Sequence, residues 1–278
     1  MKKISRRSFM AAAAVSVAAL ALTACGGSAS SAASSVASSA ASSEAASSAA
    51  AADLTTVEAG KLTMATNAAF PPYEMTTDAG EFEGIDVDTA KAIAEKLGLE
   101  LQIDDMDFDA ALLSVQQGKA DIVMAGVTVT DERKAVMDFS DSYATGIQSI
   151  IVPNDSELAS PDDLAGKTIG TQRGTTGYIY CSDDFGDENV VAYDDGLTAV
   201  QALNNGQVDA VVIDNAPAQE FVAANPGLKV LDTSYAEEDY AIGMAKGSAL
   251  EDAVNKALEE LKADGTLQAI VDKYINAN

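Results

Sequence analysis

Histidine is absent from the 278 residues of the chain, and cysteine and basic residues are scarce. Without histidine the chain can form no Ser-His-Asp or Cys-His nucleophile, no histidine metal ligand and no histidine proton shuttle. The cysteines are Cys25 and Cys181, which are too few for a disulfide framework. Lysine and arginine number 17 against 43 acidic residues, so nucleic acid is a poor partner. We therefore expect neither a metal ion nor a cofactor.

Residues 1–24 have the organisation of an export signal. A basic start at residues 1–7 precedes an apolar run of about fourteen residues, which is too short for a stable membrane span. The sequence Leu-Thr-Ala-Cys-Gly that ends at residue 26 resembles the lipobox of bacterial lipoproteins, which implies cleavage before Cys25 and lipid on its sulfur. The pair Arg6-Arg7 leaves the Tat route open beside Sec. We expect an exported protein, anchored by lipid on the extracytoplasmic face of the cell membrane.

The remaining chain divides into a tether and an α/β fold. Residues 25–53 follow the signal as the lipid-bearing cysteine and a Ser/Ala-rich stretch that cannot bury a core. From residue 54 onward, short segments in which apolar and polar residues alternate are typical of strands, and amphipathic helices separate them. This order of strands and helices predicts an α/β fold. Residues 115–123 and 203–211 form a partial repeat, in which a helix end, a glycine and an aspartate precede a buried strand. The sequence therefore predicts two similar α/β lobes.

Capping residues predict two of the helix starts. Asp88 precedes a segment whose apolar residues recur at helical spacing, and we expect it to cap that helix. Ser248 and Glu251 have the spacing of a capping box at the start of a later helix.

The stretch from residue 119 to residue 133 has the strongest functional pattern. A short apolar run that ends at Met124 is typical of a buried strand, and the threonines that follow offer hydroxyl groups. Thr130 is a suitable N-cap for a helix that begins with Asp131 and carries Arg133. An arginine at the carboxyl end of a strand can bind a carboxylate through two parallel hydrogen bonds. A solvated charged turn is the alternative interpretation of this helix start.

Six short segments together resemble the amino-acid-specific extracellular solute-binding proteins of ABC importers, the family of the glutamine-, histidine- and arginine-binding proteins. These segments are residues 70–74, 84–88, 126–133, 138–140, 174–177 and 206–214. The resemblance implies two α/β lobes joined by a two-segment hinge, the type II periplasmic-binding-protein-like fold. The first lobe would comprise residues 54–143 and 241–278, and the second would comprise residues 144–240 with the hinge segments.

The resemblance also assigns nine positions to an amino-acid ligand. They are Arg133, Thr128, Gly126 and Thr176 at the α-carboxylate, Asp214 at the α-ammonium, Phe70 and Phe108 around the side chain, and Asn67 and Gln172 at its far end. Arg133 and Asp214 supply the opposite charges that a zwitterion needs. Because they come from different lobes, ligand would favour the closed form. The aromatic rings as core residues, Gln172 as a surface amide and Asp214 as a turn residue are the alternative interpretations.

The substrate prediction depends on the residues expected at the far end of the ligand. Neutral Asn67 argues against a charged far end, whereas Gln172 suits an amide, a hydroxyl or a guanidinium. Polar uncharged amino acids are therefore favoured, with arginine or lysine next. We expect a monomer that delivers its ligand to an ABC permease and is not an enzyme. The alternatives are a dehydratase on the same scaffold, with Glu74 or Asp109 as its acid, and a sensory module for a membrane receptor.

Overall fold

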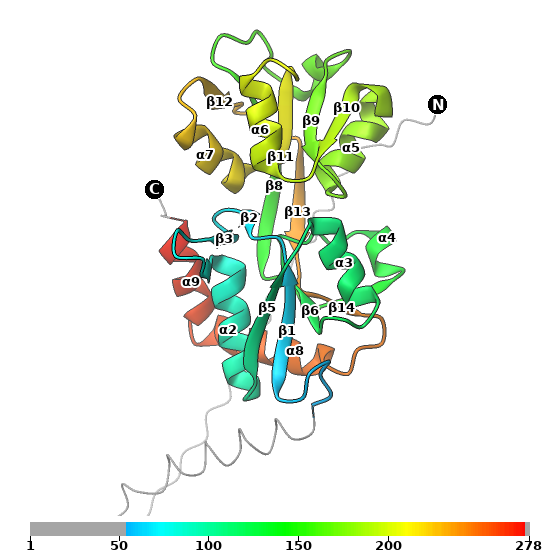
Figure 1. The fold of residues 1–278 in the computed structure, drawn as a ribbon, viewed down its shortest axis with the longest axis vertical. Coiled ribbons are helices and arrows are strands. Elements are labelled where there is room, and N and C mark those ends of the chain that lie inside the picture. Colours follow the sequence, from blue (N-terminus) through cyan, green and yellow to red (C-terminus); the bar gives the residue numbers. More distant parts are fainter. Residues whose placement is uncertain (1–53, 276–278) are drawn as a thin grey trace, which may run out of the picture. The chain divides into compact units, whose positions relative to one another are not determined.

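The computed structural model describes residues 54–275, which contain two large β-sheets flanked by helices and a third, small sheet (Figure 1). The predicted signal, lipobox and tether lie outside the described residues. Within residues 54–275, no helix is long and apolar enough to cross a membrane.

A five-stranded mixed sheet forms the core of what we call the first lobe. Its strands, in spatial order, are β5 (Glu100–Asp105), β1 (Lys61–Thr66), β6 (Ile122–Val123), β14 (Gly243–Ala245) and β7 (Met137–Phe139). The first three are parallel, and β14 is antiparallel to both of its neighbours. The lobe also contains the small sheet β2 (Ala69–Phe70), β3 (Glu74–Thr76) and β4 (Phe82–Glu83).

Helices cover both faces of this sheet because successive residues of β1 point to opposite sides. Leu62 and Met64 pack with the helices α2 (Ile85–Leu97), α8 (Glu251–Ala263) and α9 (Thr266–Tyr274). Ala65 faces the other side and packs with α3 (Phe108–Gln116). A short helix, α4 (Asp131–Lys134), follows β6.

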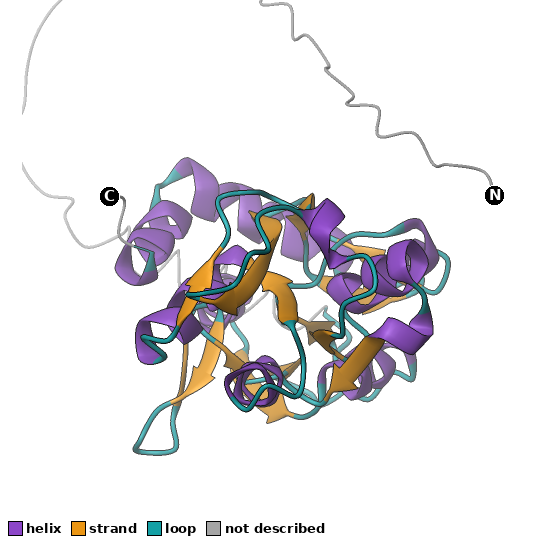
Figure 2. Ribbon diagram, turned by 90° about the horizontal axis from the view of Figure 1, so that it is seen from above, coloured by secondary structure: helices purple, strands orange, loops and turns teal. Residues whose placement is uncertain are grey.

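A second sheet repeats this plan and defines the second lobe. Its strands, in spatial order, are β10 (Val190–Tyr193), β9 (Ile169–Gln172), β11 (Ala210–Asp214), β8 (Ala144–Pro153) and β12 (Leu228–Val230), with β13 (Ala236–Tyr240) also paired to β8. Its helices are α5 (Thr176–Phe185), α6 (Gly196–Asn204) and α7 (Asn215–Ala224), with the 3-10 turns η1 (Pro161–Leu164) and η2 (Asp187–Asn189). Helices border the strands in the view from above as well (Figure 2). Cys181 of α5 is fully buried, and its burial raises its pKa to about 12, so it is an inert thiol.

Two antiparallel strands carry the chain between the lobes. The chain leaves β7 at Phe139 and enters β8 at Ala144, and it returns from β13 at Tyr240 to β14 at Gly243. Residues 144–148 of β8 pair along their whole length with β13, and we call this pair the hinge ribbon (Figure 1). The predicted fold of two similar α/β lobes with a two-segment hinge is confirmed, while the numbered limits of the lobes stay a prediction.

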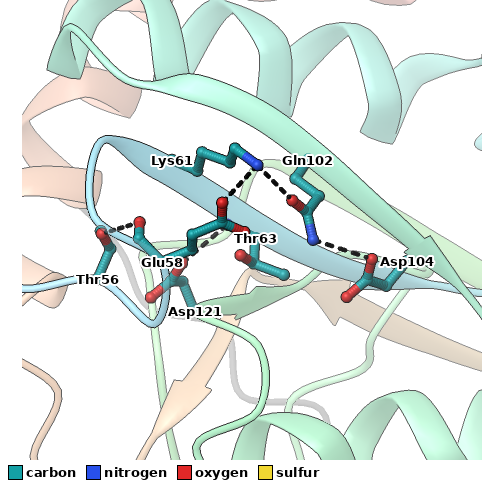
Figure 3. A network of polar contacts seen from close by, with 7 residues as sticks. All are labelled: Thr56, Glu58, Lys61, Thr63, Gln102, Asp104 and Asp121. Carbon is teal, nitrogen blue, oxygen red and sulfur yellow. Dashed lines mark hydrogen bonds and ion pairs between the residues drawn. The ribbon is translucent and has the colours of Figure 1, made fainter.

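In each lobe, the aspartate of the partial repeat accepts hydrogen bonds from backbone N–H groups near the start of a strand. In the first lobe, Asp121 accepts hydrogen bonds from the backbone N–H groups of Thr63, at 2.8 Å, and Val57, at 2.7 Å. Neighbouring polar contacts extend this network, since the ammonium of Lys61 meets both Glu58 and Gln102 (Figure 3). In the second lobe, Asp209 accepts one hydrogen bond, from the N–H of Thr168 at 2.8 Å.

The helix starts predicted from Asp88 and Ser248 are wrong. α2 begins at Ile85, four residues before the start that a cap at Asp88 would give. Its N-cap is Gly84, whose φ is 133°, and a Cβ at this position would collide with the carbonyl group of Tyr73. Asp88 instead pairs with Lys273 at 2.7 Å. α8 begins at Glu251, and the hydroxyl of Ser248 accepts only from the nearby N–H of Leu250, at 3.2 Å.

Candidate functional site

All nine residues predicted to contact the ligand line one cleft between the lobes. The lining residues are Asn67, Phe70, Glu74, Phe108, Ala125, Gly126, Thr128 and Arg133 from the first lobe and Gln172, Thr175, Thr176 and Asp214 from the second. The cleft encloses about 310 Å³, including the part open to solvent.

Arg133 brings a buried positive charge to the cleft. The hydroxyl of Thr130 caps α4 by accepting from the N–H of Arg133 at 3.2 Å, as the sequence predicted. The guanidinium donates to the carbonyl of Thr128 at 2.7 Å and, across the cleft, to that of Gly174 at 3.1 Å. Burial lowers the pKa of Arg133, which the nearby Glu238 opposes. No carboxylate among residues 54–275 forms an ion pair with it, so its charge is available to an anion.

The hydroxyls of Thr128 and Thr176 have a partner that the sequence did not indicate. Both donate to the same carboxylate oxygen, Oε2 of Glu238, at 3.1 and 3.0 Å, and Gln148 Nε2 donates to that oxygen at 3.0 Å. Glu238 is the middle one of three consecutive acidic residues, a pattern that is typical of a solvent-exposed segment. Its alternation with buried Tyr240 is the one signal that could have predicted its burial.

Asp214 supplies a carboxylate from the second lobe. It ends β11 and is buried, and it accepts a hydrogen bond from the hydroxyl of Tyr240. Burial, with a contribution from the charge of Glu238, raises the pKa of Asp214 to about 7. An ammonium group beside it would favour the ionised carboxylate.

A second pair of carboxyl groups lies in the first lobe. Glu74 and Asp86 are both fully buried. Asp86 accepts from the N–H of Gly126 at 3.0 Å and from the hydroxyl of Tyr143 at 2.7 Å, and burial raises its pKa to about 6. Glu74 interacts with the carboxyl group of Asp86, and no basic side chain among the described residues forms an ion pair with it. Burial and the neighbouring Asp86 raise the pKa of Glu74 well above its ordinary value.

The two phenylalanines have a place in both the cleft and the cores. Phe70 stacks on Tyr73 with ring centroids 5.9 Å apart, and Phe108 lies beneath the guanidinium of Arg133, 5.4 Å from its central carbon. Both rings also belong to clusters of buried apolar residues. Gly126 makes this arrangement possible, because its φ is 55° and a Cβ there would lie 2.9 Å from the ring of Phe70.

The two amides predicted at the far end of the ligand bond to each other. Gln172 Nε2 donates to Asn67 Oδ1 at 2.8 Å, across the cleft, and Asn67 Nδ2 donates to the carbonyl of Met106 at 3.0 Å. They therefore form a wall of the cleft in which part of their hydrogen-bonding capacity is already used. Within the described chain, no group of three acidic or cysteine side chains could hold a metal ion.

Residues 62–277 match the family model described as bacterial extracellular solute-binding proteins, family 3. The chain belongs to this family. It is 32% identical over 225 residues to the L-cystine-binding protein TcyJ of Escherichia coli, covering 80% of this chain and 85% of that protein.

Solved structures of related binding proteins have the same fold. The arginine-, lysine-, histidine-binding protein ArtJ of Geobacillus stearothermophilus is 35% identical with a TM-score of 0.75, covering 78% of this chain and 96% of that chain. An ancestral arginine-binding protein bound to glutamine is 41% identical with a TM-score of 0.74, covering 78% of this chain and 98% of that chain.

Membership of family 3 gives the general function. The chain is an extracellular solute-binding protein of the kind that captures amino acids for ABC transporters. Family 3 and these relatives consist of binding proteins rather than enzymes, so the dehydratase alternative has no support.

Proposed function

We propose that the cleft binds a free amino acid with a cationic side chain, arginine or lysine, and delivers it to an ABC permease. The observation that carries this proposal is the carboxyl group of Glu74, which is fully buried in the cleft wall beside the carboxyl group of Asp86 and pairs with no basic side chain among the described residues. Ionising a buried carboxyl group is costly without a cation, and a cationic side chain of the ligand would supply one.

The main-chain groups of the ligand would use the two opposite charges of the cleft. The α-carboxylate would meet Arg133 and the N-terminus of α5, where Thr175 and Thr176 line the cleft. The α-ammonium would meet Asp214. Each charge-assisted hydrogen bond contributes about 1.5–3 kcal/mol. Since the two groups come from different lobes, ligand would bind the closed form more tightly than the open form.

The charge balance then favours a cationic side chain. Arg133 and Asp214 match the two charges of a zwitterion, which leaves the buried pair of Glu74 and Asp86 for the side chain. The sequence favoured a polar uncharged ligand because of Asn67 and Gln172, but these amides bond to each other. ArtJ, which binds arginine, lysine and histidine, supports a cationic ligand.

A polar uncharged amino acid is the second candidate. The ancestral relative bound to glutamine supports it. A protonated Glu74 could also donate a hydrogen bond to an amide.

Thermal unfolding of ligand-stripped protein against the twenty amino acids would test the proposal. Arginine or lysine at 100 times its dissociation constant should add about 2.7 kcal/mol to the free energy of unfolding. Glu74→Gln should weaken arginine binding by about tenfold and glutamine binding much less, because a buried carboxylate prefers a cation. Glu81→Gln, an exposed change nearby, is the control. Tighter binding of glutamine than of arginine by the wild type would replace the proposal with the second candidate.

We further propose that the protein is a monomer, exported and held at the membrane by lipid on Cys25. The lipobox-like sequence at residues 22–26 supports this anchoring. Metabolic labelling with a radioactive fatty acid should mark the membrane fraction of the chain, and an unlabelled chain would contradict the anchor.

A further inference from the structure

Glu238 occupies an unusual position, behind the cleft rather than in its lining. It lies in the middle of β13, within the hinge ribbon, opposite Gly146 of β8. Only 6% of its surface is exposed. Its carboxylate contacts two residues that do line the cleft, Thr128 and Thr176.

The donors to this carboxylate come from three parts of the fold. Thr128 follows β6 in the first lobe, Thr176 begins α5 in the second lobe, and Gln148 belongs to the hinge ribbon. All three donate to the same oxygen, at 3.0–3.1 Å. A separation of the lobes that moves Thr128 away from Thr176 therefore breaks at least one of the two threonine bonds.

The bonds also fix how the threonine hydroxyls face the ligand. A hydroxyl has a single proton, and both protons are directed at Glu238. The oxygens of Thr128 and Thr176 can then only accept hydrogen bonds from the ligand, so its α-ammonium gains acceptors. Its α-carboxylate depends on Arg133 and on backbone N–H groups.

We propose that Glu238 is a positioning residue that couples the hinge to the ligand cleft, by holding Thr128 and Thr176 of opposite lobes on one carboxylate oxygen. Because this link can form without ligand, it raises the population of the closed form in the free protein. A larger closed population gives a higher apparent affinity. Only the effect on affinity rests on the proposed function.

The test compares Glu238→Ala with Glu238→Gln and Glu237→Ala. Alanine removes the acceptor, glutamine keeps one acceptor oxygen, and Glu237 is an exposed acid on the same strand. Small-angle scattering of ligand-stripped protein should give a larger radius of gyration for Glu238→Ala than for the wild type. Glu237→Ala should match the wild type, and Glu238→Gln should lie close to it.

Binding provides the second measurement. The dissociation constant for arginine should rise about tenfold in Glu238→Ala, as expected if the closed population falls about tenfold. Thr176→Val removes the hydroxyl that donates to Glu238 and should shift the ligand-free protein toward the open form as well. The double variant of Thr176→Val and Glu238→Ala should be no more open than either single variant. Thr176→Val also gives the scattering result if Glu238→Ala fails to fold.

Two outcomes would overturn the inference. One is equal scattering of ligand-free wild type and Glu238→Ala, and the other is unchanged or tighter binding by a folded Glu238→Ala protein. A wild type that closes on another amino acid but not on arginine would instead contradict the proposed substrate, and affinity would then be measured with that amino acid.

Discussion

The two lobes share a plan but contribute unequally to the cleft. The first lobe provides the arginine, both phenylalanines and the buried acid Glu74, whereas the second provides Asp214, Gln172 and the start of α5. The repeated aspartates differ in the same sense, since Asp121 is buried with two backbone donors and Asp209 is exposed with one. We infer that most of the residues that contact the ligand are preformed in the first lobe. The second lobe then completes the site when the two lobes close.

The largest expected effect follows from removing the cation of the first lobe. Arg133→Ala should weaken amino-acid binding by at least tenfold, and by about a hundredfold if two charge-assisted hydrogen bonds are lost. Isothermal titration calorimetry would measure the change, with circular dichroism to establish folding. Arg133→Lys keeps the charge without the paired donors and should fall between the two proteins. Binding near the wild-type level by folded Arg133→Ala would show that the first lobe does not dominate.

The repeated aspartates give the next comparison, in stability rather than binding. Asp121→Ala should lower the free energy of unfolding by about 2 kcal/mol, because it leaves the buried N–H group of Thr63 and the part-buried N–H group of Val57 without their acceptor. Asp209→Ala removes a single exposed contact and should cost about 0.5 kcal/mol or less. Urea unfolding would measure both. Equal losses would mean that burial does not distinguish the two copies of the motif.

Local sequence patterns predicted the elements around the site, but contacts between residues distant in the sequence could not be predicted. The strand and helix start around Arg133 follow from the apolar run and the Thr130 cap, and the resemblance assigned nine positions that all line one cleft. Glu238 could not be predicted, because its role depends on two threonines distant in sequence that meet only in the folded chain. The start of α2 was misplaced because the conformation of Gly84 outweighs the capping preference of Asp88.

The smallest expected effect is on pH dependence, and it concerns the acid of the second lobe. Burial raises the pKa of Asp214 to about 7, so a proton competes with the ligand's ammonium below that pH. Affinity should therefore rise about tenfold between pH 6 and pH 8 and then level off. The stability of the ligand-free protein should change in the opposite direction. The folded state holds this proton more tightly than the unfolded state, so stability falls as pH rises from about 4 to about 7.

Asp214→Asn would show which lobe controls this dependence. It should bind more weakly and flatten both pH profiles, while Asp209→Asn, an exposed change in the same lobe, should leave them unchanged. Calorimetry in buffers of different ionisation enthalpy would count the protons released on binding. If Asp214→Asn keeps the full pH dependence, the titrating group is the carboxyl pair of Glu74 and Asp86 in the first lobe, whose pKa values are also raised by burial. In that case the first lobe would provide most of the contacts to the ligand and would also determine how ligand binding depends on pH.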